Sequence, residues 1–431
     1  MNHFARRRGV LHAEGVSLER LAREVGTPTY VYSRATLERH YGVVTEAFSR
    51  LSAPHLVCYS VKACSNLGVL SVLAQQGSGF DIVSGGELRR VQAAGGELRK
   101  VVFSGVGKTV EELSAAHAAG ILFFNVESAE ELEALDAVGR RGGRPAPFAL
   151  RVNPEVDAKT HPYIATGLRT SKFGVPFREA VALYARARRM KGLRAVGVDC
   201  HIGSQLTDAA PVTEALRRVS DLYLQLKAAG HPLSYLDVGG GLGITYSDER
   251  PPSPDAYARR VVKATARTGA TLVMEPGRVL VGNAGVLLTR VLYRKRSPAR
   301  TFVVVDAGMN DLLRPALYGA HHAVEPVKPR RGTAARVDVV GPVCESSDVL
   351  AKGRRLVLPR QGDLFAVRSA GAYGMSMASR YNGRALPAEV LVDGGGYTVV
   401  RAREPLDALW RGERVAPPRR KTTTRKRGQA T

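Results

Sequence analysis

Short apolar runs alternate with stretches of helical spacing along the first two thirds of the chain. The runs are rich in Val, Ile, Leu and Phe, whereas the stretches between them carry Ala, Leu, Glu and Arg at intervals of three and four residues. This alternation predicts βα units and a parallel sheet. We count eight runs, at 56–62, 80–84, 101–105, 121–127, 148–153, 196–202, 235–239 and 272–275. Eight strands close a (β/α)8 barrel, so we expect an α/β protein of that fold, with a doubly wound sheet as the alternative.

The pattern changes after about residue 285. Apolar runs at 286–293, 301–306, 335–340, 363–369 and 388–392 are separated by Gly and Pro, with few long helical stretches between them. Such spacing predicts a β-rich second domain. We therefore expect a lead-in to this domain at 1–33, the barrel at 34–285, the C-terminal β domain at 286–414, and a basic, disordered tail at 415–431.

Composition is typical of an ordinary soluble globular protein. The 431 residues are 44% hydrophobic and 24% charged, and no run of 18 uncharged apolar residues predicts a membrane span. The cysteines, Cys58, Cys64, Cys200 and Cys344, form no CxxC pair and no metal-ligand spacing, so we expect free thiols and no metal site. The N-terminus lacks the apolar segment of a secretory signal. We expect a cytoplasmic protein.

The formal net charge of +24 raises the alternative of a nucleic-acid-binding protein. Residues 415–431 contain six Lys or Arg and no acidic residue, so +18 remains on the rest of the chain. That excess is spread along expected helix faces, as at 186–191, and indicates a solvated basic surface. We expect no specific nucleic-acid partner.

Polar residues and glycines gather at the C-terminal ends of the expected strands. They are Lys62, Asp81, Ser84, Ser104, Asn125, Arg151, Asn153, His201, Gly239 to Gly241, and Glu275 to Arg278. In a (β/α)8 barrel these ends open onto one face, where active sites are built. The clustering therefore predicts an enzyme.

Lys62 follows an apolar strand in the segment YSVKACSN and would deliver one ammonium group into the barrel mouth. A desolvated lysine with a lowered pKa suits Schiff-base chemistry with a carbonyl compound. A surface lysine that extends its ammonium group into water is an equally weighted alternative. Its position alone leaves both interpretations open.

Three glycine-bearing loops follow the later strands: HIGSQ at 201–205, VGGGLG at 238–243 and EPGR at 275–278. Glycines let backbone N–H groups approach a phosphate closely, and the N-terminus of a following helix adds a favourable dipole. Barrels often build a phosphate site after strands seven and eight. The three loops together predict such a site.

Glu275 ends the eighth expected strand and should point into the same mouth as Lys62. A carboxylate beside a pyridine nitrogen keeps that ring protonated and able to accept electrons. An ion pair with Arg278 or another barrel arginine is the alternative. In the second domain, Cys344 and Glu345 lie in the polar loop GPVCESSD, and Tyr373 lies among glycines in AGAYGMSM, so none of the three is expected to serve packing alone.

Eight motifs, in order and spanning about residues 10–410, carry a family resemblance. They are YSVKACSN, FDIVSGGEL, TGLRTSKFG, HIGSQ, GGGLGI, EPGR, GPVCESSD and GAYGMSMASRYNGR. Together they resemble the fold-type III pyridoxal-phosphate-dependent decarboxylases. The resemblance implies an alanine-racemase-like (β/α)8 barrel, a C-terminal β-sandwich or β-barrel domain, bound pyridoxal 5′-phosphate, and a homodimer whose active sites lie between subunits.

The resemblance also implies roles for individual residues. For the cofactor, Lys62 would hold it covalently, His201 would stack on its ring, Glu275 would pair with the ring nitrogen, and Asp81 would support the site. Its phosphate would lie against Ser204, Gly241, Gly277 and Arg278, with Tyr373 closing this region from the other subunit. For the substrate, Arg278, Arg314, Tyr318 and Tyr373 would bind carboxylate, Glu345 would bind the distal amino group, and Cys344 of the partner chain would donate a proton.

Within this family the residues favour members that convert meso-diaminopimelate to lysine. That substrate carries two carboxylates and two ammonium groups, for which Arg278, Arg314 and Glu345 would be the partners of the distal end. Members acting on ornithine generally have Asp after the cysteine, and alanine racemases place Arg at the pyridine nitrogen. Decarboxylation of ornithine, arginine or carboxynorspermidine, or a catalytically silent homologue, are the alternatives. Cys64 departs from the family pattern, which usually has Asn there.

Overall fold

The computed structural model describes residues 2–156, 172–201, 203–208 and 210–417. Most of the motif TGLRTSKFG, Ile202 of HIGSQ, and the expected tail beyond 417 therefore lie outside the described residues. No helix in the described part of the chain is both long enough and apolar enough to cross a membrane.

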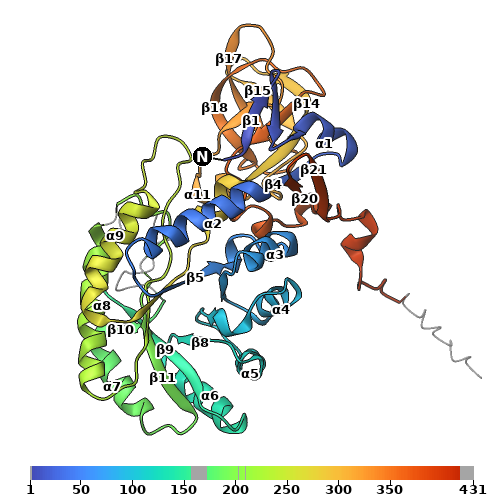
Figure 1. Cartoon of the computed structure of the whole chain (residues 1–431). Coiled ribbons are helices and arrows are strands. Elements are labelled where there is room, and N and C mark those ends of the chain that lie inside the picture. The colour runs from blue at the N-terminus through green and yellow to red at the C-terminus, as the bar shows by residue number, and fades with distance from the viewer. Residues whose placement is uncertain (1, 157–171, 202, 209, 418–431) are drawn as a thin grey trace, which may run out of the picture.

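Eight parallel strands form a closed barrel, which confirms the expected fold and excludes the doubly wound sheet (Figure 1). The strands follow one another around the barrel in chain order, and the last pairs with the first. They are β5 (His55–Ser60), β6 (Gly79–Ile82), β7 (Val101–Phe103), β8 (Phe123–Val126), β9 (Ala146–Asn153), β11 (Leu193–Asp199), β12 (Tyr235–Asp237) and β13 (Thr271–Met274). A short ninth strand, β10 (Val175–Pro176), pairs with β9 and was not expected.

Helices alternate with these strands and cover the outside of the barrel (Figure 1). They are α2 (Arg34–Ser49), α3 (Leu67–Gln75), α4 (Gly85–Ala93), α5 (Val110–Ala119), α6 (Ala129–Arg141), α7 (Phe177–Ala187), α8 (Ala210–Ala228) and α9 (Pro254–Thr265). Several begin at a Ser, Thr or Asn whose side chain accepts a backbone N–H of the first turn, as at Ser33, Asn66, Ser84, Thr109 and Ser128. Because helices cover the sheet, strands such as β6, β8 and β9 are buried along their whole length.

A second, β-rich region follows the barrel. Its main sheet has the order β18-β17-β15-β14-β4-β20-β21, and β19 joins β14 to β16. The strands are β4 (Thr29–Ser33), β14 (Gly285–Arg296), β15 (Thr301–Val305), β16 (Val324–Pro326), β17 (Ala334–Val340), β18 (Val349–Val357), β19 (Leu364–Val367), β20 (Ala388–Asp393) and β21 (Gly396–Arg401). Strands β16, β18 and β21 were not expected.

The N-terminal residues belong structurally to this second region. Strands β1 (Phe4–Arg7), β2 (Val10–Ala13) and β3 (Val16–Ser17) form a small sheet before helix α1 (Leu18–Glu24), and β4 lies between β14 and β20 in the main sheet. Ser33 then ends β4 and caps α2, the first helix of the barrel. The numerical domain limits given above stay predictions.

Candidate active site

A cavity of about 550 Å³ opens at the C-terminal ends of the barrel strands, within the size range of small-molecule sites. It brings together ten of the thirteen site residues named from the sequence: Lys62, His201, Ser204, Gly241, Glu275, Gly277, Arg278, Arg314, Tyr318 and Tyr373. Asp81 is fully buried directly behind Lys62. Cys344 and Glu345 do not line the cavity.

Lys62 lies one turn beyond its strand and faces the cavity. Strand β5 ends at Ser60, and Lys62 belongs to a 3-10 turn, Val61–Ala63, so the expectation that it ends the strand was wrong by two residues. Its Nζ donates to Asp81 Oδ2 at 2.8 Å. The lowered pKa of the first of our two interpretations is not found: burial lowers the pKa of Lys62, but the carboxylates of Asp81 and Glu275 outweigh it and raise the pKa above its ordinary value. In the described protein Lys62 is therefore an ammonium ion paired to Asp81.

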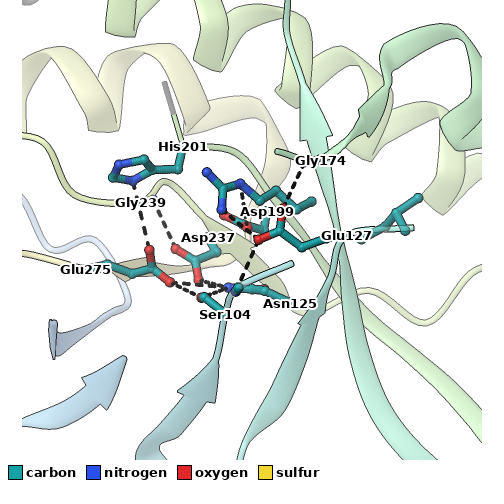
Figure 2. Close-up of polar contacts among 12 residues, drawn as sticks. Ser104, Asn125, Glu127, Gly174, Asp199, His201, Asp237, Gly239 and Glu275 are labelled. Atoms are coloured by element: carbon teal, nitrogen blue, oxygen red, sulfur yellow. Dashed lines mark hydrogen bonds and ion pairs between the residues drawn. The ribbon is translucent and has the colours of Figure 1, made fainter. Parts of the chain in front are cut away.

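Glu275 is held by a set of buried polar side chains beneath the cavity (Figure 2). Its Oε1 accepts from Ser104 Oγ at 3.1 Å and from Asn125 Nδ2 at 3.2 Å. The same amide of Asn125 donates to Asp237 Oδ2 at 3.1 Å. Among the described residues Glu275 makes no ion pair with Arg278 or with another barrel arginine, so the alternative drawn from sequence is wrong. The carboxyl group is thus fixed in place and directed toward the cavity.

The floor of the cavity carries an excess of buried acid. Glu127 pairs with Arg151 at 2.8 Å, and Arg151 Nε lies 3.9 Å from Asp199. Burial and the repulsion between carboxylates raise the pKa of Asp199 and Asp237 well above the ordinary value. Burial, followed by repulsion from Asp81, raises the pKa of Glu275 to about 7. A cationic group placed against Glu275 would relieve this excess.

His201 is neutral in this setting. Its Nδ1 lies 4.0 Å from Glu275 Oε2, but the same nitrogen accepts a hydrogen bond from the backbone N–H of Gly240 at 3.0 Å. Burial, with the nearby charges of Arg151 and Lys62, lowers the pKa of His201 well below its usual range. The ring therefore offers the cavity an uncharged flat surface.

The glycine loops pack against each other at one end of the cavity. Leu206 N donates to Gly241 O at 2.8 Å, and a Cβ added at Gly241 would lie 2.5 Å from Gly203 O. A Cβ at Gly277 would lie 3.1 Å from the Cβ atoms of both Ser60 and Ala63. The contact at Gly241 leaves room only for glycine, and the contacts at Gly277 are tight, so both loops can present backbone to the cavity.

Helix dipoles contribute less to this end than we expected. Helices α8 and α9 begin well after their glycine loops, and α10 (Arg278–Val281) has only four residues. The positive charge instead comes from Arg278, whose NH2 group donates to Ser204 Oγ at 3.1 Å. Arg278 is 5% exposed, and its Nε has no hydrogen-bond partner among the described residues.

Tyr373 reaches the cavity from within the same chain, so the expectation that the partner subunit supplies it is wrong. Its backbone N–H donates to Ala63 O at 2.7 Å, and its ring lies 4.9 Å from the Arg278 Cζ. Its φ of 55° is a left-handed conformation that a bulky residue rarely adopts. Residues with strained backbone angles cluster at active sites and ligand-binding sites, so the conformation of Tyr373 supports a functional role for this cavity.

Cys344 and Glu345 lie in the exposed loop that precedes β18. Cys344 is an exposed free thiol whose backbone N–H donates to Asn382 Oδ1 at 2.8 Å, and Glu345 accepts a hydrogen bond from the Tyr381 hydroxyl. One chain alone therefore does not bring these two side chains to the cavity that holds Lys62.

The sequence reasoning missed several residues at the site. Tyr246, Glu249 and His321 line the cavity, and Asp237 and His322 are buried behind it. Asp237 ends β12 just before the glycine run, so the rule of polar strand ends could have found it. The other four lie in loops away from strand ends, where no periodicity marks them.

The cavity fits pyridoxal phosphate in shape and charge. One end joins glycine backbone, Ser204 and Arg278, which suits a phosphate. The buried carboxylates around Glu275 suit a protonated ring nitrogen, and Lys62, paired with Asp81, lines the same cavity. The neutral ring of His201 lines the same space.

Comparisons with known proteins agree with this geometry. Residues 34–282 match the family model described as pyridoxal-dependent decarboxylase, pyridoxal binding domain. The chain is 54% identical to diaminopimelate decarboxylase of Pseudomonas aeruginosa, across 97% of this chain and 100% of that protein. The diaminopimelate decarboxylase of M. jannaschii in complex with L-lysine superposes with a TM-score of 0.92 at 37% identity, covering 97% of this chain and 99% of that one. The Helicobacter pylori enzyme complexed with L-lysine gives a TM-score of 0.88 at 43% identity, covering 91% and 98%.

Proposed function

Because this chain belongs to the diaminopimelate decarboxylase family of pyridoxal-dependent enzymes, we propose that it removes one carboxylate of meso-2,6-diaminopimelate as CO2 and releases L-lysine. The observation that carries the proposal is the pairing of two features in one cavity. Lys62, paired with the buried Asp81, faces the cavity, and two buried arginines that form no ion pair with an Asp or Glu among the described residues line the same cavity. An amino acid with a second carboxylate matches both features.

The chain's own residues would hold the cofactor in a defined orientation. Lys62 would bind it covalently. Asp81, which pairs with the Lys62 ammonium group, would take up the proton that this amine gives up. When bound, pyridoxal phosphate supplies a protonated ring that accepts the electron pair left by departing CO2. Glu275, oriented by Ser104 and Asn125, would keep the ring nitrogen protonated, while His201 would cover one ring face. Ser204, Gly241, Gly277, Arg278 and Tyr373 would surround the phosphate.

Substrate would bind against the arginines and tyrosines of the cavity. Arg278, Arg314, Tyr318 and Tyr373 line it and would bind the distal carboxylate. Glu345 would bind the distal ammonium group. Cys344 would donate the proton that replaces CO2 on the α-carbon.

We infer a homodimer in which Cys344 and Glu345 serve the partner's cavity. The support is their exposure on the chain surface, outside the chain's own cavity. A mixture of Lys62→Ala and Cys344→Ala subunits tests it. Random pairing makes half of the dimers mixed, each with one intact site, so activity should return to about one quarter of the wild-type value. Two variants that stay inactive when mixed would refute shared sites.

The proposed reaction is tested by following L-lysine formation from meso-diaminopimelate. Protein stripped of cofactor should be inactive, and added pyridoxal phosphate should restore lysine formation. Lysine formation that does not depend on the cofactor would contradict the proposal.

The unpaired thiols of all four cysteines are consistent with a reducing compartment, and we propose a cytoplasmic location.

A further inference from the structure

Two buried arginines in the cavity wall have no carboxylate partner within the part of the chain that the structure describes. Arg278 and Arg314 are each 5% exposed, and in the described part of the chain no Asp or Glu forms an ion pair with either. The carboxylate that lines the same wall, Glu249, accepts instead from the backbone N–H groups of Tyr246 and Ser247 at 2.9 and 2.7 Å. A buried charge is normally paired with an opposite charge. It therefore has to be explained why neutral groups hold these two arginines.

Tyr246 is the shared neutral contact. Its hydroxyl accepts from Arg278 NH1 at 2.7 Å, and its ring centroid lies 4.6 Å from Arg314 Cζ and 5.7 Å from Arg278 Cζ. The ring's negative face attracts both cations without neutralising their charge. One side chain thus fixes both arginines.

His322 is the second neutral contact, and its tautomer is fixed. Its Nδ1 lies 2.9 Å from Arg368 O, and since a carbonyl only accepts, Nδ1 carries the proton. Its Nε2 then has a free lone pair, which accepts from Arg314 NH1 at 2.8 Å. The ring is fully buried and packs edge-on against Tyr246 at 5.3 Å. Burial, with the charge of Arg314, lowers the pKa of His322 to about 3, so the ring stays uncharged.

We propose that Tyr246 and His322 are positioning residues that hold Arg278 and Arg314 through neutral acceptors and so leave both guanidinium charges for bound anions. Arg278 would serve the cofactor phosphate and the distal carboxylate of the ligand, and Arg314 would serve that carboxylate. A carboxylate at either position would hold the arginines more firmly but would compete with the ligand for them. The inference rests on the proposed function, because it assumes a ligand with a second amino-acid head.

Binding of two ligands that differ only in the carboxylate isolates this effect. Loss of one CO2 from meso-diaminopimelate leaves L-lysine, which retains the distal head, whereas 1,5-diaminopentane retains both amines and lacks any carboxylate. Calorimetry on the cofactor-loaded protein gives the ratio of the two dissociation constants. Before ligand is added, the visible absorbance of the cofactor attached to Lys62 shows that each variant is folded and carries the cofactor.

Four variants make the comparison specific. His322→Glu should pair with Arg314 and weaken L-lysine binding about tenfold or more, with diaminopentane unchanged. His322→Gln keeps a hydrogen-bond acceptor, so its affinity for L-lysine should stay within about threefold of wild type. Tyr246→Phe keeps the ring but loses one hydrogen bond, so its affinity for L-lysine should fall about threefold to tenfold. His231→Gln replaces another buried histidine, which packs on Tyr184 away from the cavity, and should change neither affinity.

The outcomes separate this inference from the proposed function. If wild-type protein binds L-lysine no better than diaminopentane, the assigned substrate class fails and the inference fails with it. If wild type prefers L-lysine and His322→Glu keeps that preference, the inference alone is overturned. Should His322→Glu fail to fold, His322→Leu replaces it, and equal lysine affinities of the Leu and Gln variants would overturn the inference.

Discussion

Replacement of Gly241 by alanine tests whether the glycine loops form the cofactor end of the cavity. Gly241 has a φ of +102°, and an added Cβ would lie 2.5 Å from Gly203 O and 2.6 Å from Leu206 Cδ1. The first contact is with backbone, which cannot rotate away as a side chain can. The two loops must therefore separate, and the backbone they present to the cavity must move with them.

The magnitude follows from two separable costs. A positive φ costs an alanine about 1–2 kcal/mol, and forcing a methyl group into packed atoms costs about 1–3 kcal/mol more. Gly230 is a matched control because its φ is +85° and an added Cβ meets nothing within 4 Å. We expect Gly230→Ala to lower the free energy of unfolding by about 1–2 kcal/mol and Gly241→Ala by about 2–5 kcal/mol.

Cofactor affinity is the decisive measurement. Titration of the cofactor-free variants with pyridoxal phosphate, followed by absorbance, should show a dissociation constant raised about tenfold or more for Gly241→Ala and unchanged for Gly230→Ala. Urea unfolding gives the stabilities of both proteins. Equal cofactor affinities in the two variants would refute the assignment of Gly241 to the phosphate end.

Lys62→Ala should abolish both the visible absorbance of lysine-bound cofactor and the formation of lysine, and retained turnover would remove Lys62 from its proposed role. Lys108→Met should lower the free energy of unfolding in urea by about 3–5 kcal/mol, since it leaves Glu131 without its buried counter-charge; a change near zero would contradict that reasoning. The pKa of Glu275 is about 7 in the folded protein because of burial and Asp81, whereas an unfolded Glu titrates near 4.3. The free energy of unfolding of cofactor-free protein should therefore fall as pH rises from about 4.3 to about 7, and Glu275→Gln should reduce that fall; identical pH profiles would contradict it.

The barrel was predictable because its strands are buried on both faces, which leaves continuous apolar runs in the sequence. The same reasoning missed β18, whose exposed Lys352 and Arg355 interrupt the apolar residues that face the core. It also missed the pKa of Lys62, because the contact with Asp81 joins residues 19 positions apart and exists only in the fold.

Site residues at strand ends were predictable from the pattern of the chain, whereas those outside the barrel strands were found only through the family resemblance or were missed. Glu275 and Asp81 were found because strand ends of a parallel barrel share one face. Tyr246 and His322, which contact Arg314, lie in loops that carry no periodic pattern and were not found. The positions of Cys344 and Glu345 show a further limit, since their proposed site includes a second chain.

The central claim is tested most directly by CO2 release from purified protein with added pyridoxal phosphate, measured in parallel with meso-diaminopimelate, ornithine, arginine and lysine. The account predicts release from meso-diaminopimelate alone, because Arg278 and Arg314 need a distal carboxylate. Release mainly from ornithine or arginine would contradict that substrate assignment, and no release from any of the four would contradict the proposed decarboxylase activity itself.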